Sequence, residues 1–308
     1  MTGASTVPVG RPDVDGTDEQ EVIPTSSGAW PTADPIGSQL PWWRQLRSLR
    51  KVASTRAAVF LSYRNTMLLL LGVSVVRIFM LKKVWQALYA ARPGALAIPL
   101  GDLLVYLTLA NLIAWSFPTH TVTRYLRDRI REGSVVFDVV RPVGFLPQMV
   151  AQLVGSLQGS MLIIGLSLPL VAFAGSLALP AGAQAAGLFP LSLVLAYAIA
   201  GLLALLLAMV AFWTVEVNGM VMLYVLVSSF LSGALVPVRV FPAGLRAVLD
   251  WLPFPATTYV PAGIYVGSIR GHAAWQGIGV QALWVLVLAG LAALVWRRAI
   301  HRLVVQGG

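Results

Sequence analysis

The chain has 308 residues, of which 57% are hydrophobic and 11% charged, and its mean hydropathy is +0.78. Soluble domains carry about 25% charged residues, so this composition predicts an integral membrane protein and excludes an ordinary soluble one. The net charge of +10 comes from basic residues beside apolar runs, which favours positive loops on the inner membrane face over nucleic-acid binding. The sequence has no cysteine, which excludes disulfides.

The first part of the chain divides in two by composition. Residues 1–40 are rich in Gly, Pro, Ser, Thr and Asp and have no core-forming pattern, which predicts a disordered cytoplasmic tail. In residues 41–64, apolar positions that include Trp42 and Trp43 recur at helical spacing among arginines. This pattern predicts an amphipathic helix in the membrane interface; a basic linker with chance periodicity is the alternative.

Six apolar stretches predict six transmembrane helices, since about 20 such residues cross a bilayer. They cover residues 66–89, 101–118, 146–176, 189–212, 220–236 and 274–296. Residues 238–271 are amphipathic and broken by prolines, being too polar for a span and too apolar for a solvated loop. They predict two short helices that dip into the outer leaflet, at 242–251 and 259–269.

The most charged interior segment, residues 121–144, lies between the second and third predicted spans. Its excess of arginine places it on the cytoplasmic side. Residues 125–131 are predicted to extend the preceding helix, Gly133 to stop it, and Ser134 to cap a second, short helix that ends before Pro142. A two-turn apolar helix is not stable alone, so we expect it to dock on a partner or on its own protein.

Polar residues inside predicted spans are costly in lipid, and each is therefore a candidate for function. Arg77 falls near the middle of the first span, Asn111 in the second, Gln152 in the third and Ser229 in the fifth. These four are the expected substrate path. For the small and polar stripe that contains Gln152, close helix packing is the favoured alternative.

Several motifs of enzymes are missing from the sequence. It has no Gly-x-x-x-x-Gly-Lys-Ser/Thr, and none of its lysines follows a glycine, so we expect no ATP site of that kind. It has no Gly-x-Ser-x-Gly, and His120, His272 and His301 lack metal-ligand spacing. We therefore expect neither catalysis, a metal nor a cofactor in this chain.

Two runs, together with the order of the predicted elements, resemble the membrane permease of type-2 ATP-binding-cassette exporters. The first run is REGSVVFDVVRPVGFLPQ, and the residues that carry the similarity are Gly133, Arg141 and Pro142. The second is FLSGALVPVRVFPAGLRAVLDWLPF, carried by Ser232, Gly233, Pro237, Phe241 and Pro242. The similarity begins near Trp43 and reaches the C-terminus. Such permeases are more apolar at the positions of Arg77, Lys82 and Lys83, which leaves the depth of the first span open.

The resemblance implies an all-α, polytopic membrane protein. Its permease domain would occupy residues 41–308, with an interfacial helix, six transmembrane helices, a cytoplasmic coupling helix and outer re-entrant half-helices. It would be the permease subunit of an exporter in a bacterial cell membrane, with both termini cytoplasmic and a drug-like, peptide or lipid substrate.

The resemblance also implies partners. These are a cytosolic ATPase dimer that holds ATP and Mg, a second permease subunit, identical or related, and membrane lipids; nucleic acid is not among them. The residues that would contact the ATPase are those of the short cytoplasmic helix: Ser134, Val135, Val136, Phe137, Val139, Val140 and Arg141.

Two other classes stay open at this point. One is a secondary transporter driven by an ion gradient, which would favour inverted repeats and buried carboxylates, and neither is evident in the sequence. The other is a membrane assembly protein that transports nothing.

Overall fold

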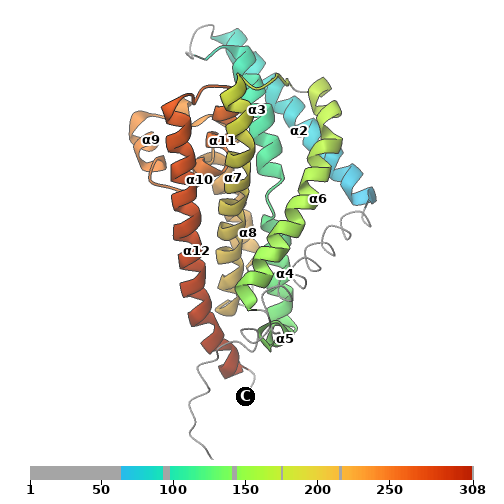
Figure 1. The fold of residues 1–308 in the computed structure, drawn as a ribbon. Helices are drawn as coiled ribbons and strands as arrows, with labels where there is room; N and C mark the ends of the chain where they lie inside the picture. Colours follow the sequence, from blue (N-terminus) through green and yellow to red (C-terminus); the bar gives the residue numbers. More distant parts are fainter. Residues whose placement is uncertain (1–63, 93–97, 141–143, 175, 215–216, 307–308) are drawn as a thin grey trace, which may run out of the picture. The chain divides into compact units, whose positions relative to one another are not determined.

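A computed structural model of the chain describes residues 64–92, 98–140, 144–174, 176–214 and 217–306. Within these ranges the regular structure is helical (Figure 1). The predicted tail at 1–40 lies outside the described residues, and so does the predicted interfacial helix, apart from Arg64, which begins α2.

Each of the six predicted spans corresponds to a helix. In chain order these are α2 (Arg64–Ala91), α3 (Leu100–Trp115), α6 (Phe145–Ala174), α7 (Ala183–Met209), α8 (Asn218–Leu231) and α12 (His272–Gln306). In the described part of the chain, three helical stretches are long and apolar enough to cross a membrane: Leu100–Arg131, Ala183–Phe212 and His272–Ile300. At 1.5 Å per residue, the 28 residues of α2 and the 30 of α6 also exceed a hydrocarbon core of about 30 Å. The chain is a multi-pass membrane protein.

The second span differs from the prediction at its inner end. Residues 125–131, predicted to extend the preceding helix, are the second half of α4 (Thr119–Arg131), which begins after Pro118, while α3 ends at Trp115. The helical stretch Leu100–Arg131 is therefore interrupted by a short break. A proline has no N–H to continue the helical ladder and disfavours helical geometry in the residue before it. The break separates an apolar α3 from an α4 that carries most of the interior charge.

The fifth span is also shorter than predicted. α8 ends at Leu231 instead of near residue 236, and its 14 residues span about 21 Å. Gly233 follows with a φ of 84°, in the left-handed region, and a Cβ there would lie 2.8 Å from the Tyr106 hydroxyl. Two side chains of α3 hold this turn, since Tyr106 Oη donates to the Gly233 carbonyl at 2.9 Å and Asn111 Nδ2 to the Ala234 carbonyl at 2.9 Å.

Short helices fill the segment before the last span, as predicted. α9 (Ala243–Leu249) and α11 (Tyr259–Tyr265) lie inside the two predicted ranges, and α10 (Phe254–Thr257) between them was not predicted. Single 3-10 turns occur at Val210–Phe212 and Val238–Val240. α9, α10 and α11 lie at the upper part of the view in Figure 1, away from α5 (Val135–Val140) at its lower end.

α7 is the central helix, and it packs against α4, α10, α11 and α12. Ala196, Ala200, Ala204 and Ala208 recur every four residues on α7 and are fully buried, so neighbouring helices approach its backbone closely. In this core, the rings of Phe145 on α6 and Trp296 on α12 stack with centroids 3.8 Å apart. The same core buries Val135, the first residue of α5.

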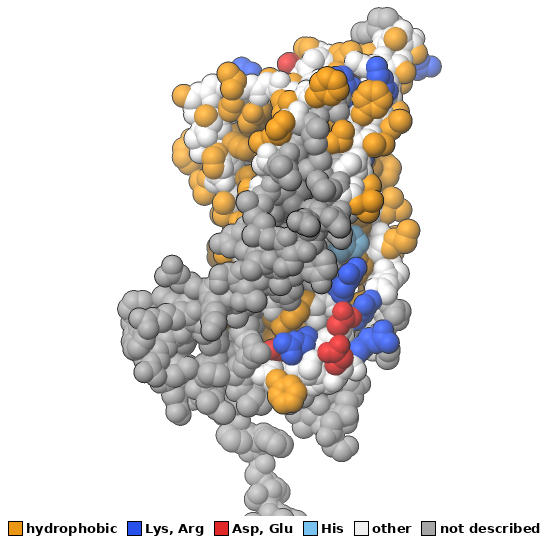
Figure 2. Space-filling view, turned by 90° about the vertical axis from the view of Figure 1, so that its right-hand side faces the viewer, with side chains coloured by type: hydrophobic (Ala, Val, Ile, Leu, Met, Phe, Trp, Pro, Cys, Tyr) orange, Lys and Arg blue, Asp and Glu red, His pale blue; other side chains and the backbone are white. Residues whose placement is uncertain are grey.

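The surface is apolar over most of its height. α12 in particular leaves large side chains exposed, among them Leu283, Leu286 and Leu294. Figure 2 shows hydrophobic side chains over the upper part of one face, a group of acidic and basic side chains toward its lower end, and a few charged side chains at its upper end. An exposed apolar surface with charged side chains at its ends is what a bilayer-embedded protein requires.

Candidate functional site

A short helix is predicted at 135–141, and the structure has α5 at Val135–Val140; its predicted cytoplasmic location stays a prediction. α5 follows α4 through a tight connection in which Gly133 has a φ of 68°, with open space where a Cβ would lie. Glycine is therefore favoured there by backbone conformation and not by crowding. Ser134 precedes α5, but its hydroxyl donates back to the Arg129 carbonyl at 3.4 Å, at the end of α4.

Asp138 fixes α5 to its neighbours. Its side chain is 1% exposed, and Oδ2 lies 3.4 Å from Arg129 Nε and 3.4 Å from the Tyr125 hydroxyl, both on α4. The Arg129 guanidinium also lies over the Tyr125 ring, 5.4 Å from its centroid. From the other side, Gln148 Nε2 on α6 donates to the Asp138 carbonyl at 3.0 Å. Polar groups of two helices thus converge on one buried residue of α5.

α5 has one fixed side and one free side. Val135 is buried in the core with Leu126 and Met149, whereas Phe137 is 69% exposed. A large apolar side chain held outward on a charged surface is typical of a contact site for another protein. The side chains of Val136, Val139 and Val140, and Arg141 as a whole, lie outside the described residues, so their predicted roles stay predictions.

Sequence reasoning missed the part of this site that involves Asp138. A sequence does not show which carboxylate of a polar segment turns inward. The available signal was its position: Asp138 lies three residues after Val135 and is therefore on the same side of the helix.

The four predicted path residues have separate surroundings. The Arg77 guanidinium on α2 lies over the Trp115 ring of α3, 6.0 Å from its centroid. Asn111 is buried, and its side chain donates the hydrogen bond to the Ala234 carbonyl described above. Ser229 turns its hydroxyl back to the Val225 carbonyl on its own helix, at 2.7 Å, and Gln152 is half-buried on α6. None of the four is among the residues that line a pocket found between α4 and α8. Their role in a substrate path stays a prediction.

The six-residue helix α5 is thus tied by an ion pair and hydrogen bonds to two longer helices, α4 and α6. In the described ranges, no three acidic or histidine side chains gather as metal ligands would.

The comparison with family models decides the class. A model described as "ABC-2 family transporter protein" matches residues 99–307, more than half of the chain. The chain belongs to the ABC-2 transporter family. The match begins at the start of α3 and includes α5 and α12, so the site around Asp138 is part of the ABC-2 membrane domain. A search of curated proteins found no match.

Membership confirms the resemblance inferred from the two sequence runs. An ABC-2 membrane domain is the permease component of an ABC transporter, generally without catalytic activity of its own, and it associates with an ABC ATPase. In this ABC-2 permease, α5 lies in the segment between the second and third predicted spans.

Proposed function

We propose that this ABC-2 permease is the membrane subunit of an ATP-driven exporter in the cell membrane. A separate cytosolic ABC ATPase dimer binds ATP and Mg and drives it, and a second permease subunit, identical or related, completes the complex. The substrate is an amphipathic, drug-like, peptide or lipid molecule. The six helices α2, α3, α6, α7, α8 and α12 span the membrane, with both chain ends in the cytoplasm.

One observation carries this proposal: Phe137 is exposed on a short helix whose opposite side is anchored. Burying a phenylalanine side chain contributes about 1.5–3 kcal/mol. Insertion of the exposed Phe137 ring into an apolar groove of the ATPase therefore supplies a substantial part of the binding free energy. The anchored side of α5 keeps the ring in one position. A two-turn helix that moved freely would absorb a push instead of passing it on.

The contacts of α5 connect it to longer helices, through which a displacement by the ATPase would be transmitted. The pair between Arg129 and Asp138 links α5 to α4, and the bond from Gln148 links it to α6. α4 in turn packs against α7 and α8. A displacement of α5 toward the membrane therefore moves the inner ends of several spans together, which is what alternating access requires.

The charges favour the same orientation. α4 carries Arg124, Arg127, Arg129 and Arg131, and the end of α12 carries Arg297 and Arg298. α5 and the C-terminal end of α12 lie at the same end of the helices in Figure 1. By the positive-inside rule that end faces the cytoplasm, where an ATPase is available.

The test is capture of the ATPase from native membranes with an affinity-tagged chain. The wild-type protein retains an ABC ATPase that hydrolyses ATP in the purified complex. Phe137→Asp loses it, because a carboxylate in an apolar groove is buried without a partner. Phe137→Trp keeps the aromatic surface and retains the ATPase.

Leu179→Asp is the matched control, since it places the same carboxylate at a highly exposed apolar position between α6 and α7. It retains the ATPase as wild type does. Equal capture by Phe137→Asp and wild type contradicts the coupling role of α5, and the absence of any ABC ATPase from the wild-type preparation contradicts the proposal as a whole.

A further inference from the structure

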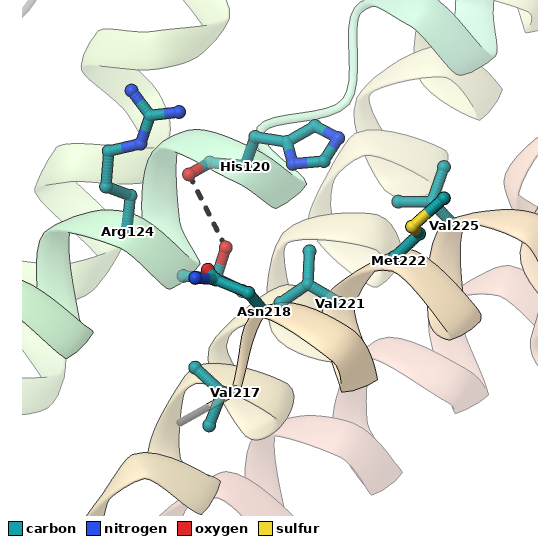
Figure 3. A pocket seen from close by; sticks show the side chains of 8 residues that line it. His120, Arg124, Val217, Asn218, Val221, Met222 and Val225 are labelled. Carbon is teal, nitrogen blue, oxygen red and sulfur yellow. Dashed lines mark hydrogen bonds between the residues drawn. The ribbon is translucent and has the colours of Figure 1, made fainter. Parts of the chain in front are cut away.

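A pocket of about 370 Å³ opens between α4 and the start of α8. Figure 3 shows the lining side chains, which come from both helices, with Arg124 on one side and Met222 and Val225 on the other; the dashed line marks the hydrogen bond that the Thr123 hydroxyl donates to the His120 carbonyl at 3.4 Å. The volume is in the range of roughly 300–1,000 Å³ found for small-molecule sites. The lining residues are His120, Thr123, Arg124, Val217, Asn218, Val221, Met222 and Val225.

The polar side of the pocket is suited to an anion. Arg124 is exposed, and in the described part of the chain no carboxylate forms an ion pair with it, whereas the neighbouring Arg127 pairs with Asp128 at 2.9 Å. None of the eight lining residues is acidic. Arg127 also donates to the side-chain oxygen of Asn218, and Arg124 is the arginine among the residues that line the pocket.

The N-termini of α4 and α8 add to the positive potential that Arg124 creates at the pocket. α4 begins at Thr119 and α8 at Asn218, both beside the pocket, and neither has a side-chain cap hydrogen bond at its N-terminus. The first N–H groups of a helix are unpaired within it and carry a partial positive charge, which favours anions. These starts support the guanidinium and do not make the site by themselves.

The other side of the pocket is apolar and continues along α8. Val221 and Val225 form a wall, and Met222 at its edge is 77% exposed. Leu226 and Phe230 follow Met222 at four-residue intervals, and both are exposed. Residues four apart lie on one side of a helix, so an exposed apolar track leads from the pocket along α8.

We propose that this pocket binds the anionic headgroup of an amphiphile whose apolar tail lies along the track from Met222 to Phe230. A phosphate or carboxylate head pairs with Arg124, and the tail covers side chains that are otherwise exposed. Two sources have this chemistry, a transported amphiphile and a resident membrane lipid. Assignment of the ligand as cargo rests on the proposed function, whereas the binding does not.

The test uses the purified permease with its ATPase in nanodiscs of phosphatidylcholine, and phosphatidylglycerol as the anionic probe. Wild type binds phosphatidylglycerol saturably and in preference to phosphatidylcholine. Arg124→Ala weakens this binding about tenfold or more, since it removes a charge-assisted hydrogen bond. Arg131→Ala is the matched control, because Arg131 is an exposed arginine of the same helix outside the pocket, and it leaves the binding unchanged.

A second variant separates the headgroup from the tail. Met222→Ser weakens the binding of long-chain phosphatidylglycerol more than that of a dihexanoyl analogue, because only the long chain reaches along α8. Equal binding of phosphatidylglycerol to wild type and Arg124→Ala overturns the inference, and so does equal binding of the two lipids to wild type.

ATP hydrolysis distinguishes the two sources and keeps this inference separate from the proposed function. Hydrolysis that rises with the probe in wild type, and not in Arg124→Ala, identifies the bound amphiphile as cargo. Binding without a change in hydrolysis identifies a resident lipid. A preparation that contains no ATPase overturns the proposed function, while the binding comparison between wild type and Arg124→Ala still decides the pocket.

Discussion

Asp138→Ala tests whether a buried ion pair holds α5 in place. Removal of one partner of a fully buried pair costs about 3–5 kcal/mol, and loss of an exposed pair costs about 1 kcal/mol or less. The Asp138 side chain is 1% exposed and that of Arg129 26%, so the remaining guanidinium reaches water in part. We expect a cost of about 2 kcal/mol for the docking of α5. A free-energy change of 1.4 kcal/mol changes an equilibrium constant tenfold, so a cost of about 2 kcal/mol raises the undocked fraction of α5 roughly thirtyfold.

Amide hydrogen exchange of the reconstituted protein measures this change, since exchange by local opening reports the opening equilibrium. We expect faster exchange in Val135–Val140, unchanged exchange in α7, and weaker capture of the ATPase. Asp128→Ala is the control, because it removes the same chemical group from a pair in which the carboxylate is 45% exposed. Equal exchange in α5 for Asp138→Ala and wild type refutes the anchoring role, as does an equally large effect of Asp128→Ala.

Three further predictions concern the membrane domain. Gln281→Leu removes hydrogen bonds to α7 and α10 and lowers the stability in detergent by about 1 kcal/mol. Gln276→Leu, at an exposed position of the same helix, has no effect, and equal melting temperatures of the two variants would count against a stabilising role of these buried hydrogen bonds. Gly233→Ala lowers stability by about 2–3 kcal/mol, and Gly133→Ala, with open space around it, by about 1; the reverse order in thermal melts would show that the turn after α8 relaxes freely. Arg77→Leu lowers ATP turnover by the reconstituted complex and leaves the melting temperature nearly unchanged; unchanged turnover would remove Arg77 from the substrate path.

Local chemistry was enough to predict α5 from the sequence. Gly133 and Pro142 bracket a short apolar run, and the structure places α5 between them. The six predicted spans followed from apolar runs alone, and each corresponds to a helix, although α3 and α8 end earlier than predicted. These features depend on neighbours in the chain, so a sequence displays them directly.

The features that sequence reasoning missed depend on distant neighbours. α8 ends early because Tyr106 and Asn111 of α3 hold the turn at Gly233, more than a hundred residues away. Gln281 joins Ser192 of α7 and the Ala256 carbonyl of α10 across the core, and its presence in an apolar run was the only local sign. A pattern can show that a polar residue is costly in lipid but not which group satisfies it.

The pocket between α4 and α8 could not be inferred for the same reason. Arg124 and Met222 are ninety-eight positions apart in the sequence, and only the packing of α4 on α8 brings them to one cavity. In the sequence Arg124 was one of several arginines that indicated the cytoplasmic side. The structure distinguishes it from Arg127 and Arg129, which have carboxylate partners.

Site-specific crosslinking is the most direct test of the role of α5. The chain has no cysteine of its own, so Phe137→Cys and Leu179→Cys each provide a single thiol without further changes. A thiol-attached photo-crosslinker at position 137 is expected to capture the ABC ATPase in native membranes, while position 179 captures none and is labelled by an impermeant maleimide from outside the cell. Labelling of position 137 from outside, or capture of the ATPase only at position 179, would contradict a cytoplasmic coupling helix.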